Sequence, residues 1–140
     1  MNLDELIAWL RRQIDDDEEI ARAAGASRWR ASSEETGDGH NVYFALSAED
    51  EADSFASTYG AEADKAEHIV RHEPVRVLAD VAAKRRILDE VVPKINAMDD
   101  KIEDEWGDGG EGPHDEAWLL ARLLALPYAD RPGYCEAWHL

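Results

Sequence analysis

The fold class is decided by residues 28–46, which read RWRASSEETGDGHNVYFAL. Two segments of alternating side-chain character flank a Gly-rich turn, and this pattern is typical of a β-hairpin. A third strand is predicted over residues 54–59, where Phe55 and Tyr59 fall on one side. The sequence therefore predicts a small antiparallel sheet of two or three strands.

The segments before and after this sheet are predicted to be helical. Residues 3–24 place apolar side chains at the helical period, with Asn2 and Glu5 as a capping box and Gly25 as the C-cap. Pro93 is expected to kink or end the second of the later helices. Those later helices are predicted over residues 61–71, 74–92, 94–106 and 115–126. The fold class is therefore α+β, with an N-terminal helix, the sheet and a helical C-terminal half, in a single domain of residues 1–140.

The charge of the chain limits its partners. It carries 32 Asp and Glu residues against 15 Lys and Arg, a formal net charge of −17 over 140 residues. Such a surface repels nucleic acid and anionic membranes and attracts basic proteins. The first residues are acidic where a signal peptide is basic, and no apolar run approaches the length of a membrane span. We therefore expect a cytoplasmic protein with no direct contact to nucleic acid or membrane.

Cysteine content argues against several kinds of site. Cys135 is the one cysteine in the sequence, which excludes an intramolecular disulfide and a zinc site built from several cysteines. There is also no Gly-rich phosphate loop and no nucleophile elbow in the sequence. The sequence therefore predicts a protein that is not an enzyme and that carries no cofactor.

Two stretches resemble an uncharacterised family. Residues 67–88 read EHIVRHEPVRVLADVAAKRRIL, and residues 123–134 read LLALPYADRPGY. Together with the opening helix and Trp29, they are similar to the family numbered sixty-two twenty-one among domains of unknown function, found in actinobacteria and their phages. The resemblance implies a genomic setting and no mechanism. Many members carry Cys pairs before the last helix, as in a zinc knuckle, but residues 106–114 contain none here, so this chain departs from that pattern.

The acidic residues form clusters at 15–19, 49–53 and 99–116, and the last holds nine acids against Lys101. Carboxylates four residues apart on a helix lie about 5–6 Å apart. Duplex DNA carries one charge per about 1.7 Å of axis, so a patterned acidic surface can imitate it. The alternative is a solvated surface that maintains solubility. The predicted partner-binding acidic face consists of Asp15, Asp16, Glu19, Asp99, Asp100, Glu103, Asp104, Glu105 and Asp108.

His68 and His72 are candidate metal ligands. They are four residues apart, and two imidazoles on one helix face can hold Zn²⁺. A third ligand would come from Glu73, His40 or His114. The alternative is that His72 caps a helix end and His68 packs against the sheet.

Residues 71–86 are locally basic, with Arg71, Arg76, Lys84, Arg85 and Arg86. A nucleic-acid-binding stripe has this appearance. The net charge of the chain opposes phosphate binding, so the favoured interpretation is internal pairing with the acidic helices.

The aromatic residues are predicted to pack in two places. Trp9, Trp29, Tyr43, Phe44 and Phe55 are expected to form the core between sheet and helices. Trp106, Trp118 and Trp138 are expected to cover a second seam.

The sequence as a whole predicts a non-enzymatic, acidic protein-binding accessory factor encoded by a phage or prophage. It would present its carboxylates to a basic host or defence protein, as a DNA mimic does. One alternative is a structural or virion-associated protein, or a homo-oligomer built through the C-terminal helices. Another is a small metal-binding protein that uses His68 and His72.

Overall fold

The structure is a computed structural model, and it describes residues 2–25, 28–35, 37, 41–47, 54–59, 63–106 and 115–140. For residues 41–47, 54–59 and 106 it describes the backbone alone. The chain divides into two compact units, Met1–Asp16 with Val81–Leu140, and Asp17–Asp80. The single domain expected over residues 1–140 stays a prediction.

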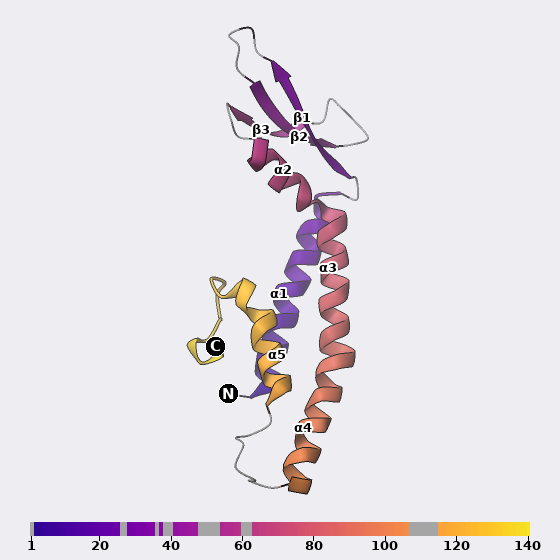
Figure 1. Cartoon of the computed structure of the whole chain (residues 1–140), viewed down its shortest axis with the longest axis vertical. Coiled ribbons are helices and arrows are strands. Elements are labelled where there is room, and N and C mark those ends of the chain that lie inside the picture. The colour runs from indigo at the N-terminus through magenta and orange to yellow at the C-terminus, as the bar shows by residue number, and fades with distance from the viewer. Residues whose placement is uncertain are drawn as a thin grey trace. The chain divides into compact units, whose positions relative to one another are not determined.

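The first unit is built from helices (Figure 1). It contains the first part of α1 (Leu3–Ala23), the end of α3 (Pro74–Arg86), α4 (Val92–Trp106) and α5 (Glu116–Ala125). α5 lies against α4. The chain then continues through short 3₁₀ turns at Leu126–Tyr128 and Glu136–Trp138.

The core of the first unit follows from the helical period. Leu6, Leu10 and Ile14 are spaced four residues apart on α1, and each is fully buried. Leu88 and Val92 repeat this spacing on the facing segment, with 1% of each exposed. Side chains four apart lie on one face of a helix, so each helix turns one apolar stripe inward.

The ends of α1 confirm the capping residues predicted from the sequence. The Glu5 N–H donates to Asn2 Oδ1 at 2.9 Å, and the Asn2 N–H donates to Glu5 Oε2 at 3.3 Å. At the other end Gly25 has a φ of +94°, which a residue without Cβ adopts readily. Both ends of the helix are thus set by local hydrogen bonding and backbone freedom.

Pro93 does not end its helix. The helical path runs from α3 through a π-helical turn at Ile87–Val91 into α4. The N–H of Val92 donates to the Ile87 carbonyl, one residue further back than in an α-helix. A proline has no N–H to donate and its ring crowds the preceding turn. The wider turn directly before Pro93 makes room for it, so the expected disturbance takes the form of a π turn.

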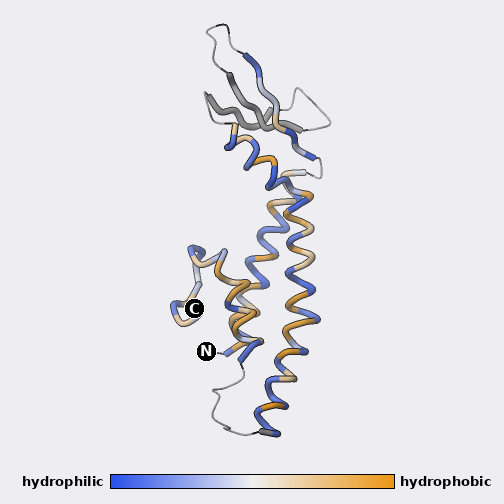
Figure 2. Tube along the Cα trace, in the orientation of Figure 1, coloured by the Kyte–Doolittle hydropathy of each residue, from blue (hydrophilic) through white to orange (hydrophobic). Residues whose placement is uncertain are grey.

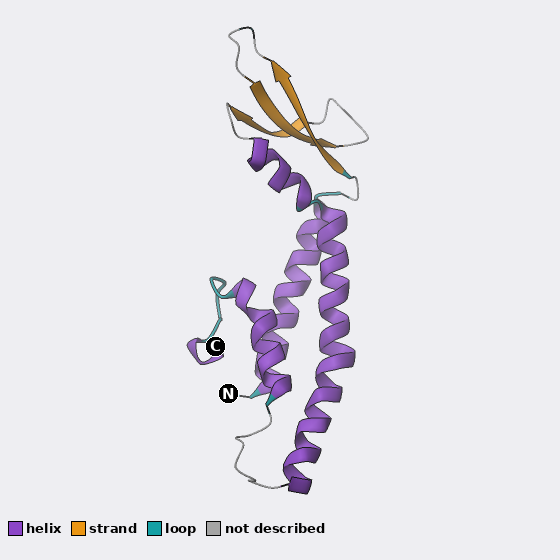
Figure 3. Ribbon diagram, viewed as in Figure 1, coloured by secondary structure: helices purple, strands orange, loops and turns teal. Residues whose placement is uncertain are grey.

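The second unit contains the strands β1 (Trp29–Glu35), β2 (Asn41–Ser47) and β3 (Ser54–Tyr59), followed by α2 (Ala63–Arg71) (Figure 3). Backbone pairing joins them in the order β1-β2-β3, with both pairs antiparallel. Trp29 pairs with Ser47 and Glu35 with Asn41, and an irregularity lies between Ala45 and Leu46. α2 packs on all three strands. The α-rich character of the predicted fold is confirmed.

Glu73 ties the start of β1 to the corner between α2 and α3. Its carboxylate accepts the Trp29 N–H at 2.9 Å and an Arg28 N–H at 3.1 Å. The Glu73 side chain is 12% exposed, and the Trp29 contact satisfies a backbone donor. This one carboxylate therefore stabilises the packing of the second unit.

The described aromatic contacts lie around Trp9 in the first unit. In the first unit Trp9 packs against Trp138 and Tyr134, with ring centroids 5.2 and 5.5 Å away. Trp29 is half-buried at the start of β1, and Trp118 is half-buried on α5. The side chains of Tyr43, Phe44, Phe55 and Trp106 lie outside the described residues. The predicted grouping of Trp9 with the sheet aromatics therefore stays a prediction, and within the first unit the C-terminal tail supplies the rings that pack on Trp9.

Figure 2 colours much of α5 as hydrophobic, whereas the tube of α4 alternates between hydrophobic and hydrophilic. Even so, none of the helices within the described residues combines the length and the apolar character needed to cross a membrane.

Candidate protein-binding surface

The second half of α4 carries the densest described group of exposed carboxylates. Asp100, Glu103, Asp104 and Glu105 are all exposed. Lys101 is the one basic residue among them, and its Nζ lies 3.6 Å from Glu105 Oε1. The last turn of α4 contains no basic side chain. The C-terminal end of a helix carries a partial negative charge, so carboxylates are unfavourable at this end.

Asp99 does not belong to this surface. Its side chain is 8% exposed, and its Oδ2 accepts the backbone N–H of Ala117 at 3.1 Å. The first N–H groups of a helix lack intrahelical acceptors. Asp99 of α4 provides an acceptor for one of these N–H groups of α5. The prediction that Asp99 faces a partner is wrong, because this carboxylate joins two helices of the bundle.

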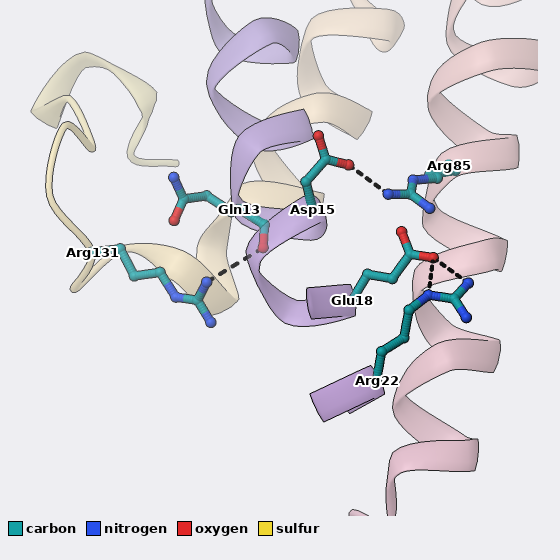
Figure 4. A network of polar contacts seen from close by, with 6 residues as sticks. All are labelled: Gln13, Asp15, Glu18, Arg22, Arg85 and Arg131. Carbon is teal, nitrogen blue, oxygen red and sulfur yellow. Dashed lines mark hydrogen bonds and ion pairs between the residues drawn. The ribbon is translucent and has the colours of Figure 1, made fainter. Parts of the chain in front are cut away.

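Asp15 is exposed but already paired (Figure 4). Its Oδ1 accepts from Arg85 at 2.5 Å, and Arg11 of the same helix lies 2.6 Å from Asp89. Asp15 of α1 meets Arg85 of α3, and Arg11 of α1 meets Asp89 of the π turn that follows α3. The two helical segments therefore run antiparallel. Figure 4 also shows Arg131 donating to the Gln13 carbonyl at 3.4 Å, and Glu18 paired with Arg22 within α1.

Within the first unit, the predicted acidic residues Asp15 and Asp99 do not lie together. Asp15 stands opposite Arg85, which precedes Asp99 by 14 residues, or about 20 Å of helix. Asp16 is exposed beside Asp15, and Glu19 is exposed in the second unit. Asp108 lies outside the described residues. What the structure brings together is the shorter set on α4.

His68 and His72 come together as the spacing predicts. Their ring centroids are 4.3 Å apart, both residues are exposed, and Nδ1 of His72 lies 2.8 Å from the His68 carbonyl oxygen. The carboxylate of Glu73 is occupied by Arg28 and the Trp29 N–H. Within the described ranges no three His, Cys, Asp or Glu side chains are grouped to hold a metal ion. His40 and His114 lie outside those ranges.

The basic residues of the 71–86 segment have partners within the protein. Arg71 pairs with Glu67, and Arg85 with Asp15. Lys84 donates to the Tyr128 hydroxyl at 2.9 Å, and Arg76 donates to the Arg71 carbonyl at 2.9 Å. Pairing with the acidic helices, the favoured interpretation of this segment, is confirmed for Arg85 with Asp15 and for Arg71 with Glu67, whereas Lys84 and Arg76 donate to a hydroxyl and a carbonyl.

The last of these basic residues, Arg86, forms a two-point contact with Glu90 one turn along the helix. Its Nε and NH2 donate to the two carboxylate oxygens at 3.1 and 3.2 Å. The hydrogen bond and the attraction to Arg86 hold the pKa of Glu90 below its usual value. The same contact raises the pKa of the Arg86 guanidinium.

The sequence did not indicate the C-terminal aromatic cluster. The Trp9 Nε1–H donates to the Pro132 carbonyl at 3.1 Å, and Arg122 Nε donates to the Trp138 carbonyl at 3.0 Å. Tyr134 and Trp138 pack edge-on at 5.6 Å. The cluster joins the first helix to the last residues of the chain, and no local pattern reports a contact of that separation.

The sequence also did not indicate which face of α5 is buried. Ala117, Ala121 and Ala125 are buried, with at most 1% of each exposed, whereas Leu119 and Leu123 are 43% and 47% exposed. The alanines recur every four residues, and this spacing is the feature of the sequence that could have identified the buried face of α5. A helix rich in Leu invites the opposite assignment, because leucines are the usual core residues.

A family model described as "Family of unknown function (DUF6221)" matches residues 3–140. No curated protein matches the chain, and no solved structure does.

Proposed function

The chain belongs to the family of unknown function DUF6221, and from its geometry we propose that it is a non-enzymatic, acidic protein-binding accessory factor. It presents the exposed carboxylates of α4 to a basic surface on a partner protein. We place it in the cytoplasm of an actinobacterium, encoded by a phage or prophage. We also propose that the fold class is α+β.

The observation that carries the proposal is the acidic end of α4. Glu103, Asp104 and Glu105 are exposed in the last turn of the helix, which contains no basic side chain, and Lys101 one turn earlier pairs with Glu105. Each carboxylate at a helix C-terminus costs about 0.3–1 kcal/mol at low ionic strength. These carboxylates destabilise the end of α4 in the free protein. A basic partner that neutralises them on binding explains why they are present.

The distribution of charge also favours a basic partner. Of the 32 acidic residues, 17 lie in the first unit and 15 in the second, while the 15 basic residues divide into nine and six. Each unit is therefore strongly negative by itself. Like charge repels nucleic acid over long range, whereas a basic protein is attracted before contact. A protein that binds nucleic acid is the partner class that a row of carboxylates suits best.

The proposal is tested by affinity capture from actinobacterial lysate with two charge-matched variants. The first carries Glu103→Gln, Asp104→Asn and Glu105→Gln, and the control carries Glu34→Gln, Glu35→Gln and Glu136→Gln, which are exposed elsewhere. We expect the wild type and the control to retain a basic protein that the α4 variant loses.

The captured protein should also dissociate as salt rises, because exposed charge pairs are screened beyond about 8 Å at physiological ionic strength. Equal capture by all three proteins would show that α4 is not the binding surface. Capture of no basic protein by the wild type contradicts the proposal as a whole.

A second candidate, a homo-oligomer built through the C-terminal helices, is favoured by the exposure of Leu119 and Leu123. Light scattering tests it directly. A stable oligomer that is insensitive to salt supports this candidate, because apolar contacts are not screened.

A further inference from the structure

His68 and His72 are two exposed imidazoles that the proposed function leaves unused. His68 lies in the last turn of α2, and His72 follows directly after the helix ends at Arg71. Their ring centroids are 4.3 Å apart, with an angle of 43° between the ring planes. Side chains four residues apart lie on one side of a helix, so both rings project from the same surface of the second unit.

The hydrogen bond of His72 fixes its tautomer. Its Nδ1 lies 2.8 Å from the His68 carbonyl oxygen. A carbonyl oxygen only accepts, so Nδ1 carries the proton, and in the neutral ring Nε2 keeps its lone pair. Histidines that bind metals characteristically donate their other ring N–H to a carbonyl or carboxylate, which orients the ring and makes the ligating nitrogen more basic. His72 therefore has the arrangement of a metal ligand supported by the backbone of α2.

The separation of the two rings suits ligands of a single ion. Imidazole nitrogens bind such ions at about 2.0–2.1 Å, so two nitrogens on one ion lie about 3 Å apart. With centroids 4.3 Å apart, a small rotation of the exposed His68 ring brings the outer nitrogens to this distance. Across the part of the chain that the structure describes, no third His, Cys, Asp or Glu completes a metal-binding group. The ion would therefore keep its other positions for water.

The charges around the pair allow a cation to approach. Arg71 is paired with Glu67 at 3.3 Å, and Arg28 with Glu73 at 3.1 Å. The second unit carries 15 acidic residues against six basic ones, which gives a net charge of −9. A negative potential of this kind raises the local concentration of cations. Electrostatics therefore favours a divalent ion at this surface.

We propose that His68 and His72 form a two-nitrogen chelate for a divalent late transition metal, with Cu²⁺ bound more tightly than Zn²⁺. The affinity of nitrogen ligands for such ions is highest at Cu²⁺, whose tetragonal geometry suits two imidazoles with open positions beside them. Ca²⁺ and Mg²⁺ prefer oxygen ligands and are poorly matched to this pair. The chelate goes beyond the proposed function, because it uses no residue of the acidic surface on α4.

The test is isothermal titration of the full chain, without a histidine tag, with Cu²⁺. We expect the affinity to fall at least about tenfold in His68→Gln and in His72→Asn, because each removes one of two linked ligands. An asparagine places an N–H where His72 has Nδ1, so this variant keeps a donor for the His68 carbonyl and lacks only Nε2. The matched control is His139→Gln, which removes an exposed histidine from the first unit and should leave the affinity unchanged.

Electron paramagnetic resonance distinguishes ligands from an effect on folding. Bound Cu²⁺ should show coupling to imidazole nitrogen in the wild type, and the His68→Gln, His72→Asn double variant should lose it while circular dichroism remains unchanged. Zn²⁺ should compete with Cu²⁺ only at higher concentration, and Ca²⁺ should not compete. The Glu103→Gln, Asp104→Asn, Glu105→Gln variant keeps both histidines and should bind Cu²⁺ as the wild type does.

The other outcomes overturn the chelate. A Cu²⁺ affinity that neither His68→Gln nor His72→Asn lowers shows that the ion binds elsewhere, and an absence of binding overturns the site outright. Loss in one single variant alone shows that one imidazole acts without the other. Competition by Ca²⁺, or loss of binding in the α4 variant, shows that carboxylates hold the ion. None of these results bears on capture of a basic partner, so the proposed function is tested separately.

Discussion

Gly133 lies where the C-terminal tail passes Trp9, and it shows how single residues hold the aromatic cluster. Its φ is +82°, and a Cβ there would lie 3.1 Å from Trp9 Nε1 and 3.4 Å from Trp9 Cδ1. Gly25 has a similar φ of +94° with nothing within 4 Å of its Cβ position. The two glycines therefore share a backbone requirement and differ in the space around them.

We predict that Gly133→Ala lowers the free energy of unfolding by about 2–3 kcal/mol, from backbone strain plus the displaced ring. Gly25→Ala, which adds backbone strain alone, should cost about 1 kcal/mol. Urea denaturation of both variants measures the difference. Equal losses would mean that Trp9 yields to the added methyl without cost.

Asp99 is the second residue whose surroundings set its role. Asp99→Ala leaves the buried N–H of Ala117 without its acceptor, and we predict a loss of about 1–3 kcal/mol. Asp100→Ala, one residue away and exposed, should change stability by less than about 0.5 kcal/mol. Chemical denaturation gives both values. An Asp99→Ala variant as stable as the wild type would contradict the assignment of Asp99 to the core.

At the scale of the element, the direction of α4 decides what its charges do. Glu103→Gln with Asp104→Asn removes two carboxylates from a negative helix end, so stability should rise by about 0.3–1 kcal/mol per residue at low salt. Asp4→Asn is the matched control, because Asp4 lies in the first turn of α1, where a carboxylate is favourable. It should be destabilising. Melting temperatures at two salt concentrations test this. A melting temperature raised by both the α4 substitutions and Asp4→Asn would exclude the dipole explanation.

The packing of α5 is also a property of the element, because its alanines are buried and two of its leucines are exposed. Ala121 is fully buried, so Ala121→Leu must force α5 away from its neighbours, and we predict a loss of about 1–3 kcal/mol. Leu123→Ala shortens a side chain that is 47% exposed and should lie within about 0.5 kcal/mol of wild type. Denaturation midpoints distinguish the two. A stabilised Ala121→Leu variant would show that the alanine stripe leaves room for a larger side chain.

At the scale of the whole molecule, the net charge of −17 acts on stability as well as on binding. Self-repulsion opposes the compact state, and salt screens it as the Debye length falls from about 30 Å at 0.01 M to about 8 Å at 0.15 M. We therefore expect the melting temperature to rise over this range in calorimetry. A fall would mean that ion pairs such as Arg11–Asp89 outweigh the repulsion.

The helices and their ends were largely predictable, because the interactions that set them are local. The capping box of Asn2 and Glu5, the Gly25 C-cap and Pro74 at the start of α3 each involve residues within one or two turns. The response to Pro93 was only partly predictable. A proline disturbs a helix in several ways, and the surrounding packing selects the π turn.

The candidate site was predictable in composition but not in arrangement. Asp15 and Asp99 counted as surface acids because their neighbours in sequence are acidic. Arg85, 70 residues from Asp15, and Ala117, 18 residues from Asp99, are the contacts that changed their roles. The proposed role on α4 remains with the exposed carboxylates Asp100, Glu103, Asp104 and Glu105.

The sequence by itself determined the net charge, the helical segments, the residues that cap them and the membership of the family. The net charge depends on composition, the helices and their caps depend on contacts within about four residues, and the family match depends on the order of residues 3–140. Only the tertiary structure decided that Trp9 packs against Trp138, that Asp99 is buried and that α5 turns its alanines inward. Each of these depends on which distant segment supplies the neighbouring surface, and a local pattern contains no information about that neighbour.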